Sequence, residues 1–166
     1  MSLNDAMNEL ALMNTRLHAV KEMWKELGRG LDAMVSDWQS ADKKLRNEFL
    51  EYRSYLSPSI TEEEGLKKIS VKHGSATLRL NDPIGHISVK FVRETSFGSS
   101  NLLVLYSTTI DEHGNRQLIR IDDQDATPCS LENLIETVRQ NLVHPKVLPA
   151  RVGIAMAEMN AHTTAE

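Results

Sequence analysis

The side chains most capable of chemistry are spread along this chain without forming a metal or catalytic motif. The six histidines are His18, His73, His86, His113, His144 and His162. No two of them lie four residues apart, as a helical metal pair would, and none stands in an HExxH context. His73 and His86 fall near the ends of neighbouring predicted strands, where they could meet, although surface positions in turns are favoured for both.

Cys129 is the only cysteine and the one candidate nucleophile. It lies near the start of a predicted helix, where a thiolate would be stabilised, and His113 or His144 could approach it. An incidental thiol is the favoured interpretation, because a single cysteine beside a proline forms no catalytic motif.

Two further segments lack the residues that their chemistry would need. The acidic run at residues 122–125 has neither the glycine nor the glutamate of an EF-hand loop, so a solvated loop is favoured. The glycine pair at residues 28–30 lacks the lysine and the preceding strand of a phosphate loop. The sequence therefore predicts no catalytic residue, no metal and no cofactor.

Composition points to a soluble chain of 166 residues with 40% hydrophobic and 25% charged residues. The net charge of −4 disfavours nucleic acid as a partner, because phosphate neutralisation needs a basic surface. The N-terminus lacks the pattern of a signal peptide, and no apolar run reaches the roughly 18 residues of a membrane span. With a lone cysteine, these features lead us to expect a cytoplasmic protein.

Residues 1–56 are predicted to form a coiled-coil segment, with a long amphipathic helix over 3–56. Every seventh residue from Leu3 to Tyr52 is apolar, and the positions three further on are apolar except for Glu48. This a/d heptad pattern keeps one seam facing a partner helix. The predicted oligomer or partner interface is Leu3, Leu10, Met13, Leu17, Val20, Trp24, Leu27, Leu31, Met34, Trp38, Leu45 and Tyr52.

Gly28 and Gly30 leave two interpretations of this helix open. Each interior glycine costs a helix about 1 kcal/mol relative to alanine, which would suit a hairpin of 3–27 and 31–56. A continuous helix is favoured, because the heptad phase passes through the glycines unbroken. In that case the glycines permit close approach of a neighbouring element.

The expected cover of the seam is another helix, because the rest of the chain looks too small to cover so long a rod. Trp24 and Trp38 are bulky for a two-stranded seam, and Met7 and Val35 widen the stripe. A bundle of more than two helices is one explanation for this width. Docking of the helix against the chain's own sheet is the other.

Residues 66–149 are predicted to form a five-stranded antiparallel sheet with a helix on it. Pro58 ends the first helix, and capping-box spacing predicts a short helical turn within a linker at 57–65. Apolar residues then alternate with polar ones in short runs separated by turn residues, as in an antiparallel meander. The continuous apolar run in 101–110 predicts a central strand covered on both faces.

The last strand and the second helix are predicted from weaker patterns. Ile119 and Ile121 are expected to face inward from a strand at 117–123. Thr127 is a plausible N-cap, with Pro128 at the first helical position. Apolar residues at helical spacing from Leu131 to Leu142 then predict a helix that packs on one face of the sheet. Residues 150–166 form a tail that could include a short helix.

The fold is therefore predicted to be α+β, and three functional classes remain. The leading hypothesis is a non-enzymatic protein–protein interaction module, of regulator, inhibitor or chaperone type, that forms a homo-oligomer and binds another protein. The second is a small enzyme or ligand-binding domain with an oligomerising stalk. The third is a dimeric nucleic-acid-binding regulator, with residues 43–46 or Lys67, Lys68 and Lys72 as phosphate contacts.

Overall fold

The protein is a sheet with two helices, and its computed structural model describes residues 2–48, 56–81, 85–95, 97–110, 116–121 and 128–143. Helix α1 covers Leu3–Glu48 and helix α2 covers Leu131–Leu142. Between them lies an antiparallel meander in the order β1-β2-β3-β4-β5-β6-β7. The strands are β1 Ser59–Glu63, β2 Leu66–Val71, β3 Gly74–Asn81, β4 His86–Thr95, β5 Gly98–Ile110, β6 Arg116–Arg120 and β7 Pro128–Cys129.

The α+β prediction and the antiparallel sheet are confirmed, but the sheet has seven strands rather than five. The capping-box spacing at Ser59 and Glu62 is coincidental, because this segment pairs with β2 as strand β1. Thr127 lies outside the described residues, and Pro128 and Cys129 pair with β6 instead of opening the helix. Ser130 is the actual N-cap of α2, and its hydroxyl accepts a hydrogen bond from the Asn133 backbone N–H at 3.1 Å.

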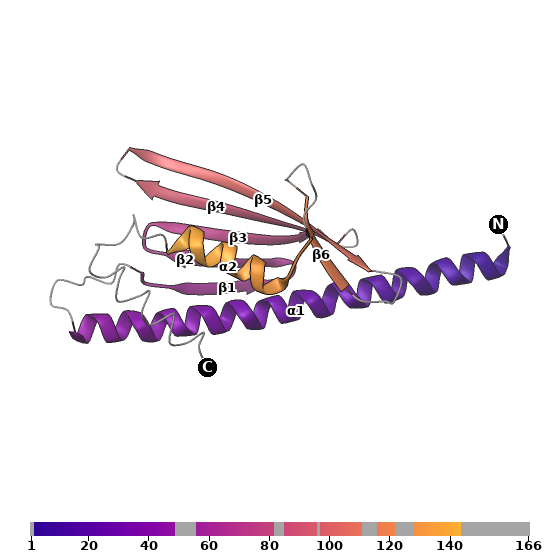
Figure 1. Ribbon diagram of the computed structural model, residues 1–166, viewed down its shortest axis with the longest axis horizontal. Coiled ribbons are helices and arrows are strands. Elements are labelled where there is room, and N and C mark those ends of the chain that lie inside the picture. The colour runs from indigo at the N-terminus through magenta and orange to yellow at the C-terminus, as the bar shows by residue number, and fades with distance from the viewer. Residues whose placement is uncertain are drawn as a thin grey trace.

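Both helices lie on one face of the sheet, which makes a two-layer structure (Figure 1). Alternate residues point into this layer: Ile69, Ala76, Leu78, Ile87, Val89, Phe91, Val104, Tyr106 and Leu118 are buried there. Helix α2 supplies Leu134, Val138 and Leu142 to the same core. The backbone carbonyl of Asn141 accepts a hydrogen bond from the Arg93 guanidinium at 3.0 Å and ties the end of α2 to β4.

The opposite face of the sheet has no helical cover among the described residues. Strand β5 lies between β4 and β6, yet Leu103 on its uncovered side is 54% exposed. The prediction that this strand is covered on both faces is therefore wrong. The inward residue of β6 is Leu118, whereas Ile119 lies on the uncovered face and Ile121 is 38% exposed. The prediction that Ile119 and Ile121 face inward is therefore wrong, because the inward-facing position of this strand is one residue away, at Leu118.

Helix α1 runs through Gly28 and Gly30 without a break, so the hairpin interpretation is wrong. A Cβ at Gly28 would lie 2.7 Å from Lys67 Nζ, and one at Gly30 would lie 2.5 Å from Ile135 Cδ1. The two glycines therefore let β2 and α2 approach the helix backbone closely. The predicted end of the helix at residue 56 is wrong, because Leu56 is not helical. Residues 49–55 and the tail at 150–166 lie outside the described residues.

Candidate self-association surface

Helix α1 is divided into a buried part and an exposed part. Between Val20 and Leu45, its apolar stripe packs against the sheet and α2. Residues 2–16 are all exposed, and only Leu17 and Ala19 are partly covered before Val20. Figure 1 shows this N-terminal part of α1 extending past the end of the sheet. We call residues 2–19 the overhang.

The sheet reaches α1 at Val20, which sets the boundary of the overhang. Gly85 has a φ of +75°, and a Cβ added there would lie 3.2 Å from Val20 Cγ2. Thr108 lies against the same glycine, and its backbone N–H donates to the Gly85 carbonyl at 3.0 Å. The turn before β4 and the end of β5 therefore close the core at this level of the helix.

The overhang carries a row of large apolar side chains in water. Leu3 is 76% exposed, Met7 60%, Leu10 59% and Met13 58%. With Leu17 they occupy a, d and e heptad positions, on the stripe that is buried further along α1. Contiguous exposed apolar surface on a soluble protein marks an interaction site more often than chance, so this surface is a candidate for self-association.

The predicted interface residues thus fall into two groups. Leu3, Leu10, Met13 and Leu17 lie on the overhang. The others that the structure describes belong to the chain's own hydrophobic core: Val20, Trp24, Leu27, Leu31, Met34, Trp38 and Leu45. The chain's own sheet and helix α2 cover this second group, as in the alternative in which the helix docks against the chain's own sheet. The expectation that a further helix must cover the whole seam was wrong for residues 20–45. Tyr52 lies outside the described residues.

Hydrogen bonds at the N-terminal end of the overhang stabilise its helical conformation. The Asp5 backbone N–H donates to Ser2 Oγ at 3.2 Å, and the Ser2 backbone N–H donates to Asp5 Oδ2 at 3.3 Å. This reciprocal pair has the geometry of a capping box and satisfies two amides at the start of the helix. Because the packed part of α1 supplies the nucleus, the overhang needs only to propagate the helix outward.

A buried lysine lies where α1 meets the first two strands. Lys67 Nζ is 4.7 Å from the centroid of the Trp24 ring and 3.6 Å from Glu62 Oε2. A nearby cavity of about 640 Å³ is lined by Lys21, Trp24, Glu64, Gly65, Leu80, Asn81 and His86.

His73 and His86 lie at opposite ends of β3, because Gly74, next to His73, pairs with Arg93, whereas Asn81 pairs with His86. The two histidines that could have met are therefore far apart.

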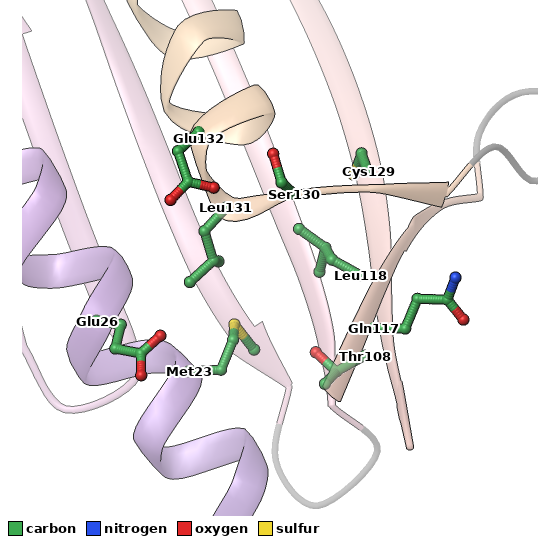
Figure 2. A pocket seen from close by; sticks show the side chains of 9 residues that line it. All are labelled: Met23, Glu26, Thr108, Gln117, Leu118, Cys129, Ser130, Leu131 and Glu132. Atoms are coloured by element: carbon green, nitrogen blue, oxygen red, sulfur yellow. The ribbon is translucent and has the colours of Figure 1, made fainter. Parts of the chain in front are cut away.

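Cys129 lines a second cavity, of about 340 Å³, between α1, the end of the sheet and the start of α2 (Figure 2). Met23, Leu118 and Leu131 supply its apolar lining, and Glu26 and Glu132 supply carboxylates. Burial raises the pKa of the Cys129 thiol, and the positive charge of Arg120 opposes this effect only in part. The helix N-terminus therefore does not yield the activated thiolate that a nucleophilic role would need.

The raised pKa predicts that Cys129 is alkylated more slowly in the folded protein than in the urea-unfolded chain at pH 8. Iodoacetamide reacts with the thiolate, and the folded chain holds the thiol proton to higher pH. The stabilisation from this group is present below the unfolded pKa and is lost as pH rises through the folded one. Mass spectrometry against pH measures both rates. A faster folded reaction at neutral pH would indicate an activated nucleophile instead.

Three further findings concern the whole described part of the chain. No group of three or more His, Cys, Asp or Glu side chains there could hold a metal ion. Neither described helix is long and apolar enough to cross a membrane. Comparison of the sequence and the structure with protein-family models, curated proteins and solved structures finds no match.

Proposed function

We propose that this protein is a non-enzymatic protein–protein interaction module whose subunits associate through the overhang. The observation that carries the proposal is the exposed stripe of Leu3, Met7, Leu10 and Met13, in phase with the buried stripe of the same helix. Full burial of a leucine or methionine side chain contributes about 1.5–3 kcal/mol. Covering this row would therefore stabilise an assembly, within which the helix–sheet unit would be presented to a partner protein.

The other two functional classes receive less support from the described residues. Lys67 is buried on the covered face beside Trp24, whereas Lys68 is exposed on the other side of the strand, so these lysines do not form one phosphate-binding surface. An enzymatic role centred on Cys129 is disfavoured by the raised pKa of its thiol.

The test introduces negative charges into the exposed stripe of the overhang and measures the mass of the protein in solution. The double variant Leu10→Asp/Met13→Asp should reduce the mass found by light scattering on a sizing column to the monomer value of 18.7 kDa. The far-ultraviolet circular dichroism should keep its helical signature, because neither residue contributes to the chain's own core.

The matched control adds the same charge away from the stripe. Asn4→Asp/Asn8→Asp changes exposed residues at b and f positions of the same helix and should leave the oligomer intact. A wild-type protein that is monomeric at every concentration would contradict the proposal. So would an oligomer whose mass is unchanged by charges at Leu10 and Met13.

A further inference from the structure

We infer that the overhang pairs with the overhang of a second copy of this chain, with the two helices antiparallel. The inference rests on the proposed function and adds the identity of the occupant, the orientation and the register. It follows from where the sheet ends along α1 and from how charge is distributed on the overhang.

The end of the sheet rules out a parallel pair. The stripe exposed up to Leu17 is the stripe that the sheet covers from Val20 onward. A second helix docked parallel on the exposed stripe would run on into the space that the sheet occupies. A second helix docked antiparallel runs the other way, past Leu3 and away from the sheet. The two sheet units then lie at opposite ends of the dimer and do not collide.

The heptad pattern and the start of the sheet together set the antiparallel register of greatest overlap. Antiparallel seams place an a residue opposite a d residue, so Leu10 meets Met13 and Leu17 meets Ala6 of the second copy. In this register, Leu3 of each copy reaches the level of Val20, where the other copy's sheet begins. A shift by one heptad in the direction of greater overlap would bring Leu3 to the level of Leu27, which is fully buried under the sheet.

Charge selects the same register and orientation. Glu9 and Arg16 both occupy g positions, and g positions lie beside each other across an antiparallel seam. Glu9 of one copy therefore pairs with Arg16 of the second copy, and this contact occurs twice in the dimer. Both side chains are exposed. Neither takes part in an ion pair with another described residue. A shift by one heptad toward less overlap would place Glu9 beside Glu9. A parallel pair would place Arg16 beside Lys21 of the second copy, which repels.

The two charges that pair, Glu9 and Arg16, therefore lie in the same short segment of the chain. The segment is complementary to a second copy of itself, as a two-fold symmetric interface requires. The overlap spans about 27 Å of helix, at roughly 1.5 Å per residue over the overhang. The two copies of α1 together would form a helical axis of about 110 Å, with one sheet unit at each end.

The first experiment exchanges the charges. Arg16→Glu would place two carboxylates side by side at both Glu9 contacts of the antiparallel dimer and should raise the dissociation constant about tenfold at low salt. The double variant Glu9→Arg/Arg16→Glu should restore the wild-type value. In a parallel dimer, Arg16→Glu would instead attract Lys21 and lower the dissociation constant, which would overturn the inference. Sedimentation equilibrium measures all three constants, and circular dichroism confirms folding.

The second experiment measures the orientation directly. A spin label on Asn4→Cys in a Cys129→Ser background should lie roughly 25 Å from its counterpart, because about 15 residues of helix separate the two levels. A parallel pair would bring the labels within about 15 Å of each other, since they would then lie at the same level of two adjacent helices. A short distance in a confirmed dimer would overturn the orientation and leave the proposed function standing. A monomeric wild-type protein would overturn both.

Discussion

Replacement of Leu31 by aspartate is expected to unfold the chain. Leu31 on α1 is fully buried in the hydrophobic core, and an unpaired carboxylate there would have neither a partner nor water. Its desolvation costs several kcal/mol, which is a large part of the stability of a domain of this size. Circular dichroism and limited proteolysis should show loss of the sheet together with the helix.

Leu10 supplies the matched control for Leu31, because the two leucines occupy the same heptad position three heptads apart. Leu10 is 59% exposed, so Leu10→Asp should leave each chain folded and act only on association. The heptad pattern alone assigns the two residues the same role. If Leu31→Asp were folded and merely monomeric, α1 would be docked on another chain rather than on its own sheet.

Replacement of Trp38 by alanine is expected to cost about 3–5 kcal/mol of unfolding free energy. Trp38 is 1% exposed and is the largest fully buried side chain that the structure describes. Truncation to alanine removes its contacts and leaves a cavity that the surrounding backbone can fill only in part. Urea denaturation followed by circular dichroism, with variant and wild type compared at one temperature, measures the loss.

The Phe variant separates the packing of Trp38 from its polar group. The buried indole N–H has no hydrogen-bond partner among the described residues, and an unsatisfied buried donor costs about 1–3 kcal/mol. Trp38→Phe removes that donor along with part of the ring, so the two changes offset each other and the loss should stay below about 1.5 kcal/mol. Equal losses for the alanine and phenylalanine variants would show that packing around the ring is not the stabilising term.

Local pattern predicted the elements of this fold where one face is strongly apolar. In the runs that begin at Ile69, Ala76 and Ile87, apolar residues alternate with polar ones without interruption. Each run forms a strand whose apolar side chains face the core. Strand β1 was missed because four of its five residues are polar or charged, and its pattern resembles a helix start as much as an edge strand. Strand β7 has only two residues, too few for any period.

The candidate surface was likewise predicted from the sequence only in part. Leu3, Leu10, Met13 and Leu17 were within the predicted seam, and Met7 was within the widened stripe beside it. The seam alone does not distinguish Leu10, which is exposed, from Leu31, which is buried. A heptad records which side of a helix is apolar, but not what covers that side.

The sequence alone predicts a helix over residues 3–56 with one apolar stripe, followed by an antiparallel sheet and a second helix, and the structure describes the first of these as helix over Leu3–Glu48. Hydrophobic periodicity depends on residues that are neighbours in the sequence, so it can be recognised without knowledge of the fold. The extent of the cover, from Val20 to Leu45 and not over the residues before Val20, is a property of the tertiary structure alone. That boundary depends on the approach of Gly85 to Val20, two residues that are 65 positions apart in the sequence, and such long-range packing leaves no periodic trace in the residues of the helix.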